Sequence, residues 1–97
     1  MPQTVYLVTY DIADPDRLRK VFKVMKGAGE HVQFSVFRCV LSDRAREELV
    51  DALERVIERA EDQVLLVDLG PEDGRAAVCI TPLGKPYQPP ARKALIV

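Results

Sequence analysis

Residues 3–16 read QTVYLVTYDIADPD, and this stretch predicts a central strand that leads directly into a helix. Residues 3–10 are rich in β-branched and aromatic side chains, with apolar residues at both odd and even positions, as in a strand buried on both faces. Asp14 is a favourable helix N-cap, and Pro15 suits the first helical position. Asp11 is therefore expected at the carboxyl end of a central strand, just before a helix.

The rest of the chain continues this alternation of strands and helices. An apolar stripe follows Pro15 and ends at Gly27 and Gly29, which predicts a helix over about 15–28. The further expected elements are a strand run over 32–41, a helix over 43–61, a strand over 63–69 and a short last strand over 76–81. A kink near Phe37 and Arg38 is expected to divide the 32–41 run into two strands. The order βαββαβ predicts an α+β fold, with an antiparallel sheet, both helices on one face and an extra C-terminal strand.

The length of 97 residues indicates one domain, expected over 1–81, followed by a proline-rich arm over 82–97. The arm ends in an apolar segment, 94–97, which we expect to pack as a tail strand on a partner protomer. With both helices on one face, the other face of the sheet would leave apolar side chains in water. Pairing two such faces or edges across a two-fold axis would cover them, which favours a homodimer. The sequence has no run of about 20 apolar residues and starts directly with the strand pattern, so a cytoplasmic protein without a membrane span or signal peptide is expected.

Charge is distributed unevenly along a chain whose formal net charge is only −1. The first helix carries five basic residues without an interleaved acid: Arg17, Arg19, Lys20, Lys23 and Lys26. We expect them on the side opposite the apolar stripe, where bound phosphates would offset their mutual repulsion. The surface therefore favours nucleic acid as a partner, although a solvated polar face is the alternative. The two cysteines, far apart and without metal-ligand spacing, are expected to be reduced and buried.

Asp11 is the first candidate for chemistry, because it ends a central strand, where α/β proteins often place functional groups, and because Asp14 already supplies the helix cap. A solvated turn residue is the alternative. Ser35 and Phe37 are candidates for supporting the site, at the expected kink of the 32–41 run. For these two residues a purely structural role, as a sheet hydroxyl and a packing aromatic, stays open.

The chain resembles the CRISPR-associated Cas2 family in two segments and in the distance between them. The segments are YDIAD at 10–14 and VQFSVF at 32–37, with the basic run between them. The resemblance covers about residues 4–81. It implies a ferredoxin-like homodimer, metal-dependent nuclease activity in some members, and in many systems a dimer that bridges Cas1 integrase subunits. It also implies that Asp11 is the metal-binding carboxylate, one from each protomer. Family members often carry a second arginine directly after the first, where this chain has Leu18.

Three hypotheses follow. The first is an endonuclease in spacer acquisition for antiviral defence, in which Asp11 binds Mg²⁺ or Mn²⁺, the metal activates a water, and Arg17 and Lys20 place the phosphate. The second is a non-catalytic DNA-binding adaptor between Cas1 subunits, which needs the basic face but not Asp11. The third is a regulatory module that binds a small ligand and not nucleic acid.

Overall fold

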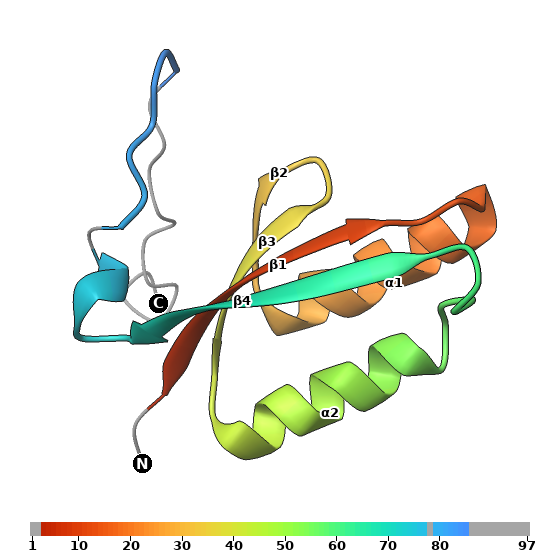
Figure 1. Ribbon diagram of the computed structural model, residues 1–97, viewed down its shortest axis with the longest axis horizontal. Helices are drawn as coiled ribbons and strands as arrows, with labels where there is room; N and C mark the ends of the chain where they lie inside the picture. The colour runs from red at the N-terminus through yellow and green to blue at the C-terminus, as the bar shows by residue number, and fades with distance from the viewer. Residues whose placement is uncertain (1–2, 78, 86–97) are drawn as a thin grey trace, which may run out of the picture.

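The computed structural model describes residues 3–77 and 79–85, which form one antiparallel sheet with two helices packed on a single face (Figure 1). The elements are β1 (Thr4–Asp11), α1 (Pro15–Ala28), β2 (Glu30–Gln33), β3 (Val36–Leu41), α2 (Asp43–Glu54) and β4 (Gln63–Pro71), followed by a 3-10 turn over Arg75–Ala77. The strand order is β2-β3-β1-β4, and every neighbouring pair is antiparallel. The predicted α+β fold of the ferredoxin-like type is confirmed.

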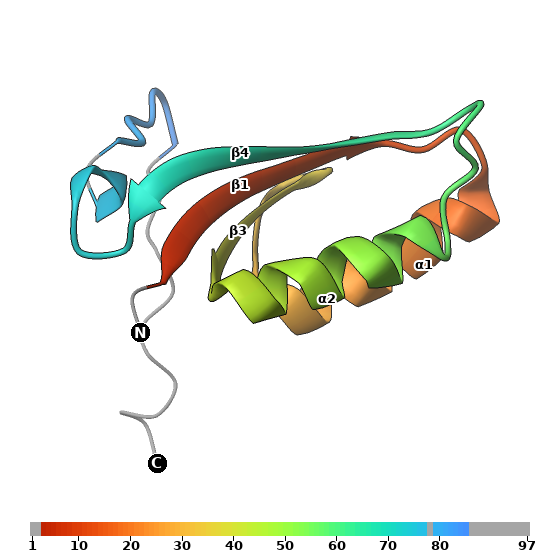
Figure 2. The same cartoon turned by 60° about the horizontal axis from the view of Figure 1, so that its bottom comes forward.

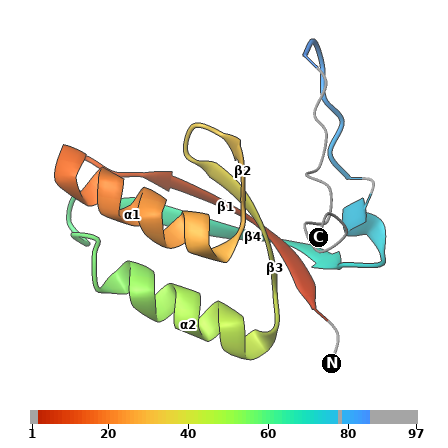
Figure 3. The same ribbon diagram turned by 180° about the vertical axis from the view of Figure 1, so that it is seen from behind.

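The core lies between the sheet and the helices, and strand alternation decides which residues reach it. Val8 pairs with Phe37 of β3 and with Leu66 of β4, so these three side chains share the helix-covered face. Val21 and Met25 of α1 complete the centre of this core and are fully buried. Figure 2 shows both helices beneath the sheet, and Figure 3 shows them side by side on that face.

The opposite face of the sheet is open in the single chain. Leu65 and Val67 of β4 project from it with 50% and 44% of their surface exposed. Because side chains alternate along a strand, β1 directs Thr9 and Asp11 to this same face, opposite Leu65 and Gln63. The open face therefore carries both exposed apolar surface and the candidate carboxylate.

Several boundaries differ from the sequence predictions. The division of the 32–41 run lies at Phe34 and Ser35 rather than at Phe37, because Gln33 pairs with Val36 and leaves a two-residue turn between the strands. Helix α2 ends at Glu54, seven residues before the predicted end at 61. Its last turn tightens as two successive backbone N–H groups, those of Val56 and Ile57, donate to one carbonyl of α2.

The C-terminal prediction is wrong for the described part of 76–81. A 3-10 turn occupies Arg75–Ala77, and residues 79–81 form no strand, since no described neighbour in this chain offers them a ladder of hydrogen bonds. Most of the proline-rich arm, and the tail strand with it, lies outside the described residues. Cys39 is free and fully buried as expected, but Cys79 is free and only half-buried. Among the described residues, no helix has the length and apolarity needed to cross a bilayer.

Candidate functional site

Asp11 ends β1 and stands at the rim of the sheet, beside the turn into α1. The register sets it opposite Gln63, the first residue of β4, and its side chain is exposed. The predicted N-cap is confirmed, because Asp14 caps α1 by accepting the backbone N–H of Arg17 at 2.9 Å. No hydrogen bond or ion pair to another described residue engages the Asp11 carboxylate. It is therefore available to a ligand from outside the chain.

The donor set that one chain offers to a metal is small. No group of three or more His, Cys, Asp or Glu side chains among the described residues is arranged to hold an ion. An exposed carboxylate without a protein partner fits one ligand position of Mg²⁺, which keeps several of its waters and is often held by one or two carboxylates. The residues present thus fit half of such a site, and the same carboxylate of a second copy would supply the other half.

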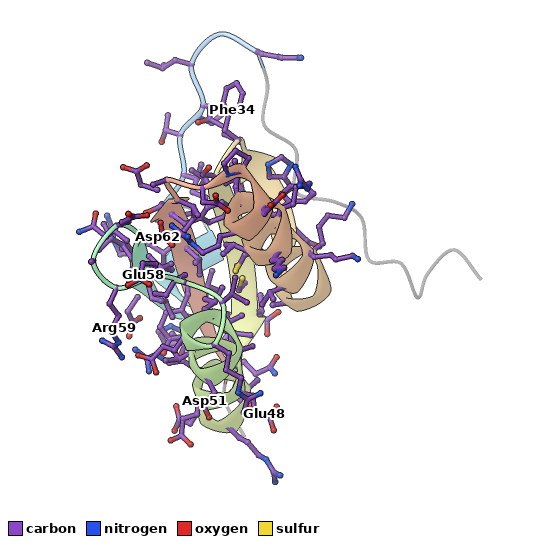
Figure 4. The ribbon with its side chains drawn as sticks, turned by 90° about the vertical axis from the view of Figure 1, so that its right-hand side faces the viewer. Phe34, Glu48, Asp51, Glu58, Arg59 and Asp62 are labelled. Atoms are coloured by element: carbon purple, nitrogen blue, oxygen red, sulfur yellow. The ribbon has the colours of Figure 1, made fainter. Side chains whose placement is uncertain are left out.

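Asp62, which sequence reasoning missed, holds the segment between Asp11 and α1 through hydrogen bonds. Its side chain is 0% exposed and comes from the loop that leads into β4 (Figure 4). The carboxylate accepts the backbone N–H of Ala13 at 2.9 Å and that of Glu58 at 2.8 Å. It also accepts Nε of Arg17 at 2.8 Å, and the same guanidinium reaches Glu61 at 2.9 Å. One carboxylate therefore joins the loop after β1, the first turn of α1 and the loop before β4.

This cluster fixes the charge state of its members. The hydrogen bond from Arg17 holds the pKa of the Asp62 carboxyl well below its usual range, and the N–H groups of Glu58 and Ala13 lower it further against the effect of burial. The same bonds to Asp62 and Glu61 raise the pKa of the Arg17 guanidinium. Both shifts favour the charged forms of Arg17 and Asp62, and through the N–H of Ala13 the Asp62 carboxylate holds the backbone two residues after Asp11.

The basic face of α1 is smaller than predicted. Lys20, Lys23 and Lys26 are exposed. Arg19 is also exposed but pairs with Asp16. Arg17 does not belong to this face, because it turns toward Asp62 and Glu61. The expectation that all five cations lie together opposite the apolar stripe is wrong for Arg17, whose contact with nucleic acid stays a prediction.

Ser35 and Phe37 are two positions apart in the sequence but have different surroundings in the structure. Phe37 is fully buried and stacks on Tyr10, with ring centroids 6.3 Å apart, and on His31, at 4.8 Å. The Ser35 carbonyl accepts the backbone N–H of Tyr10 at 3.1 Å. Burial raises the pKa of the Tyr10 phenol, and a hydrogen bond with the Ser35 side chain partly offsets this. Both residues thus contact Tyr10, which precedes Asp11, and their support of a site at Asp11 stays a prediction.

A hollow of about 850 Å³ opens between α1 and the β2–β3 turn, and sequence reasoning did not find it. Its lining combines aromatic and apolar side chains with cations: Tyr10, Leu18, Phe22, His31, Phe34 and Ser35 with Asp16, Arg19, Lys20 and Lys23. Phe34 projects outward from the turn, as Figure 4 shows. The signal in the sequence was the VQFSVF segment at 32–37. It reads as one continuous strand, so the turn at Phe34 and the exposure of its ring are not apparent from the pattern.

The sequence and the fold both have known relatives. A family with the description CRISPR associated protein Cas2 matches residues 4–76. A CRISPR-associated endoribonuclease Cas2 of Rhodospirillum rubrum is 46% identical over 92 residues, which cover 95% of this chain and 89% of the relative. A second, from Geobacter sulfurreducens, is 40% identical over 94 residues, which cover 96% of this chain and 97% of the relative. The crystal structure of Streptococcus pyogenes Cas2 superposes with a TM-score of 0.70 at 29% identity, covering 82% of this chain and 99% of that one. The chain therefore belongs to the Cas2 family of CRISPR-associated proteins.

Proposed function

We propose that this protein is a divalent-metal-dependent endonuclease that hydrolyses phosphodiester bonds of RNA or DNA, acting in the cytoplasm during spacer acquisition for antiviral defence. The observation that carries the proposal is the Asp11 carboxylate, exposed at the end of β1 and unengaged by any described residue. The names of the relatives from Rhodospirillum rubrum and Geobacter sulfurreducens, both called endoribonucleases, support the reaction class.

The active form is proposed to be a homodimer built on the open face of the sheet. Leu65 and Val67 expose apolar surface there, and burying it against a second copy would stabilise the pair. Because Asp11 lies on the same face, the two-fold axis could bring both carboxylates together. The tail over 91–97 is proposed to add to this interface, and its deletion should weaken the dimer.

Within this proposal each group of the chain has a distinct task. A Mg²⁺ or Mn²⁺ ion, when bound, would make a coordinated water more acidic and so supply the nucleophile. Asp11 from each protomer would hold that ion. Lys20 and Lys23 would hold the phosphate backbone by charge, and the Arg17–Asp62 pair would keep the turn after Asp11 in one conformation.

The test compares cleavage of labelled RNA and DNA by the wild type and by Asp11→Asn, in Mn²⁺ and in EDTA. Asp73→Asn is the matched control, since Asp73 is also an exposed acid but lies beyond the other end of β4. We expect cleavage to need Mn²⁺ and Asp11 but not Asp73. Equal cleavage by Asp11→Asn would refute the assignment. A wild type that binds without cleaving would instead favour the adaptor that bridges Cas1 subunits.

A further inference from the structure

Phe34 has an unusual position for a large apolar residue. It is the first of the two residues that connect β2 to β3, it has a positive φ of 20°, and 92% of its surface is exposed. Positive φ is uncommon outside glycine, and exposure leaves the ring without the stabilisation that burial gives. A polar residue or a glycine would suit this turn better on both counts. The stability of the single chain therefore does not explain why a phenylalanine occupies this position.

The turn that carries Phe34 is braced rather than loose. The His31 ring donates from Nε2 to the Phe34 carbonyl oxygen, and the same ring stacks on the buried Phe37. Phe22 of α1 meets His31 edge-on, with ring centroids 5.3 Å apart. The exposed ring thus stands at the edge of the hollow on a turn that a hydrogen bond and ring contacts tie to β3 and α1.

The charges around the hollow select its ligand. Three cations, Arg19, Lys20 and Lys23, line it against one acid, and that acid is already paired with Arg19. An apolar surface rimmed by positive charge suits a flat ring that carries a phosphate nearby. A duplex offers the phosphate, but its bases are stacked inside and cannot reach an outward-facing ring.

We propose that the hollow binds an unpaired nucleotide of a single-stranded nucleic acid, with the base stacked on Phe34 and a neighbouring phosphate held by Lys20 and Lys23. This subsite is separate from Asp11, and it rests on the proposed function only in taking nucleic acid as the ligand. Stacking on an aromatic side chain contributes to binding single strands whatever their sequence, because every base has a π-face.

The chain contains no tryptophan, so Phe34→Trp creates a single fluorescent reporter at the subsite. The matched control is Leu83→Trp, at a described position that is equally exposed but does not line the hollow. Both are titrated in EDTA with a short single-stranded oligonucleotide, with the same backbone made of abasic units, and with a duplex. We expect the oligonucleotide to quench Phe34→Trp, the abasic strand and the duplex to leave it unchanged, and Leu83→Trp to respond to none of the three.

A second measurement uses the wild type and Phe34→Ala with the same probes, one base of the single strand being replaced by fluorescent 2-aminopurine. Phe34→Ala should weaken single-strand binding by about 5- to 140-fold and leave duplex binding unchanged. The proposal is overturned if the oligonucleotide does not quench Phe34→Trp, or if Phe34→Ala binds it as tightly as the wild type. It is also overturned if Phe34→Ala lowers self-association instead, which would make the hollow a contact between copies of the chain. Since no metal is present, loss of the nuclease proposal would leave these outcomes unaffected.

Discussion

The salt dependence of nucleic-acid binding can be predicted from the charges that α1 leaves free. Arg17 is neutralised by Asp62 and Glu61, so it should release no counterion when a phosphate approaches. Lys20, Lys23 and Lys26 remain. Each phosphate of a single strand that a cation neutralises contributes about −0.7 to the slope of log K against log salt concentration. The three lysines of one helix therefore contribute a slope of about −2.1.

The consequence is measurable in one titration series. In the wild type, a fourfold rise in salt concentration should lower the part of the single-strand binding constant that comes from one α1 helix by about 18-fold. Replacing one lysine, as in Lys23→Gln, should reduce the slope by about 0.7 and the loss to about 7-fold. Fluorescence anisotropy of a labelled single strand in EDTA gives both slopes. Arg44→Gln on α2, which removes an exposed cation paired with Glu48, is the control and should leave the slope unchanged.

Two results would refute this reasoning. If Lys20, Lys23 and Lys26 can be changed to Gln together without altering the slope, α1 is not the binding surface. If Arg17→Gln changes the slope as much as a lysine does while the fold is intact, the ion pair with Asp62 opens when nucleic acid binds.

Four further outcomes are expected. Asp11→Asn should abolish metal-dependent cleavage and keep single-strand binding within about twofold, as cleavage and anisotropy assays would show; a cleaving variant contradicts the assignment. Asp62→Asn should reduce the fall in the free energy of unfolding as the pH is lowered into the acid range. The pKa of the Asp62 carboxyl is lower in the folded protein than its unfolded value of about 3.9, so this carboxylate stabilises the fold above pH 3.9 and loses that effect as the pH falls below it. Urea unfolding between pH 7 and pH 2 measures this, and parallel profiles would refute it. Burial, with a smaller effect of Glu30, raises the pKa of the Cys39 thiol to about 11, so at pH 8 alkylation followed by mass spectrometry should modify Cys79 and spare Cys39 until urea is added. Leu65→Lys should split the proposed dimer in sedimentation experiments, and an equally stable dimer would place the interface elsewhere.

Local signals were sufficient to predict the region around Asp11. The cap at Asp14 and the proline after it fixed the start of α1, and the mixed apolar pattern of 3–10 indicated a central strand. Both signals act within a few residues of the feature they predict. The same holds for the fold class, because the order of strands and helices limits the sheet to few arrangements.

Features that depend on distant residues could not be predicted in this way. Asp62 bonds to Ala13, 49 positions away, and nothing near Asp62 in the sequence indicates a buried carboxylate. Phe34 was expected inside the strand run over 32–41, because its turn contains no glycine or asparagine to mark it. The same hidden turn displaced the predicted kink by three residues, toward Phe37.

The shared use of the Asp62 carboxylate has a consequence for hydrogen–deuterium exchange. The amides of Ala13 and Glu58 both lie at exposed loop positions, where exchange is ordinarily fast, yet both donate to this one side chain. Any rotation of Asp62 that frees one of them frees the other. Once each rate is divided by that amide's intrinsic exchange rate, the two amides should therefore give one common opening free energy, which reports how often the Asp62 hydrogen bonds open in the native protein.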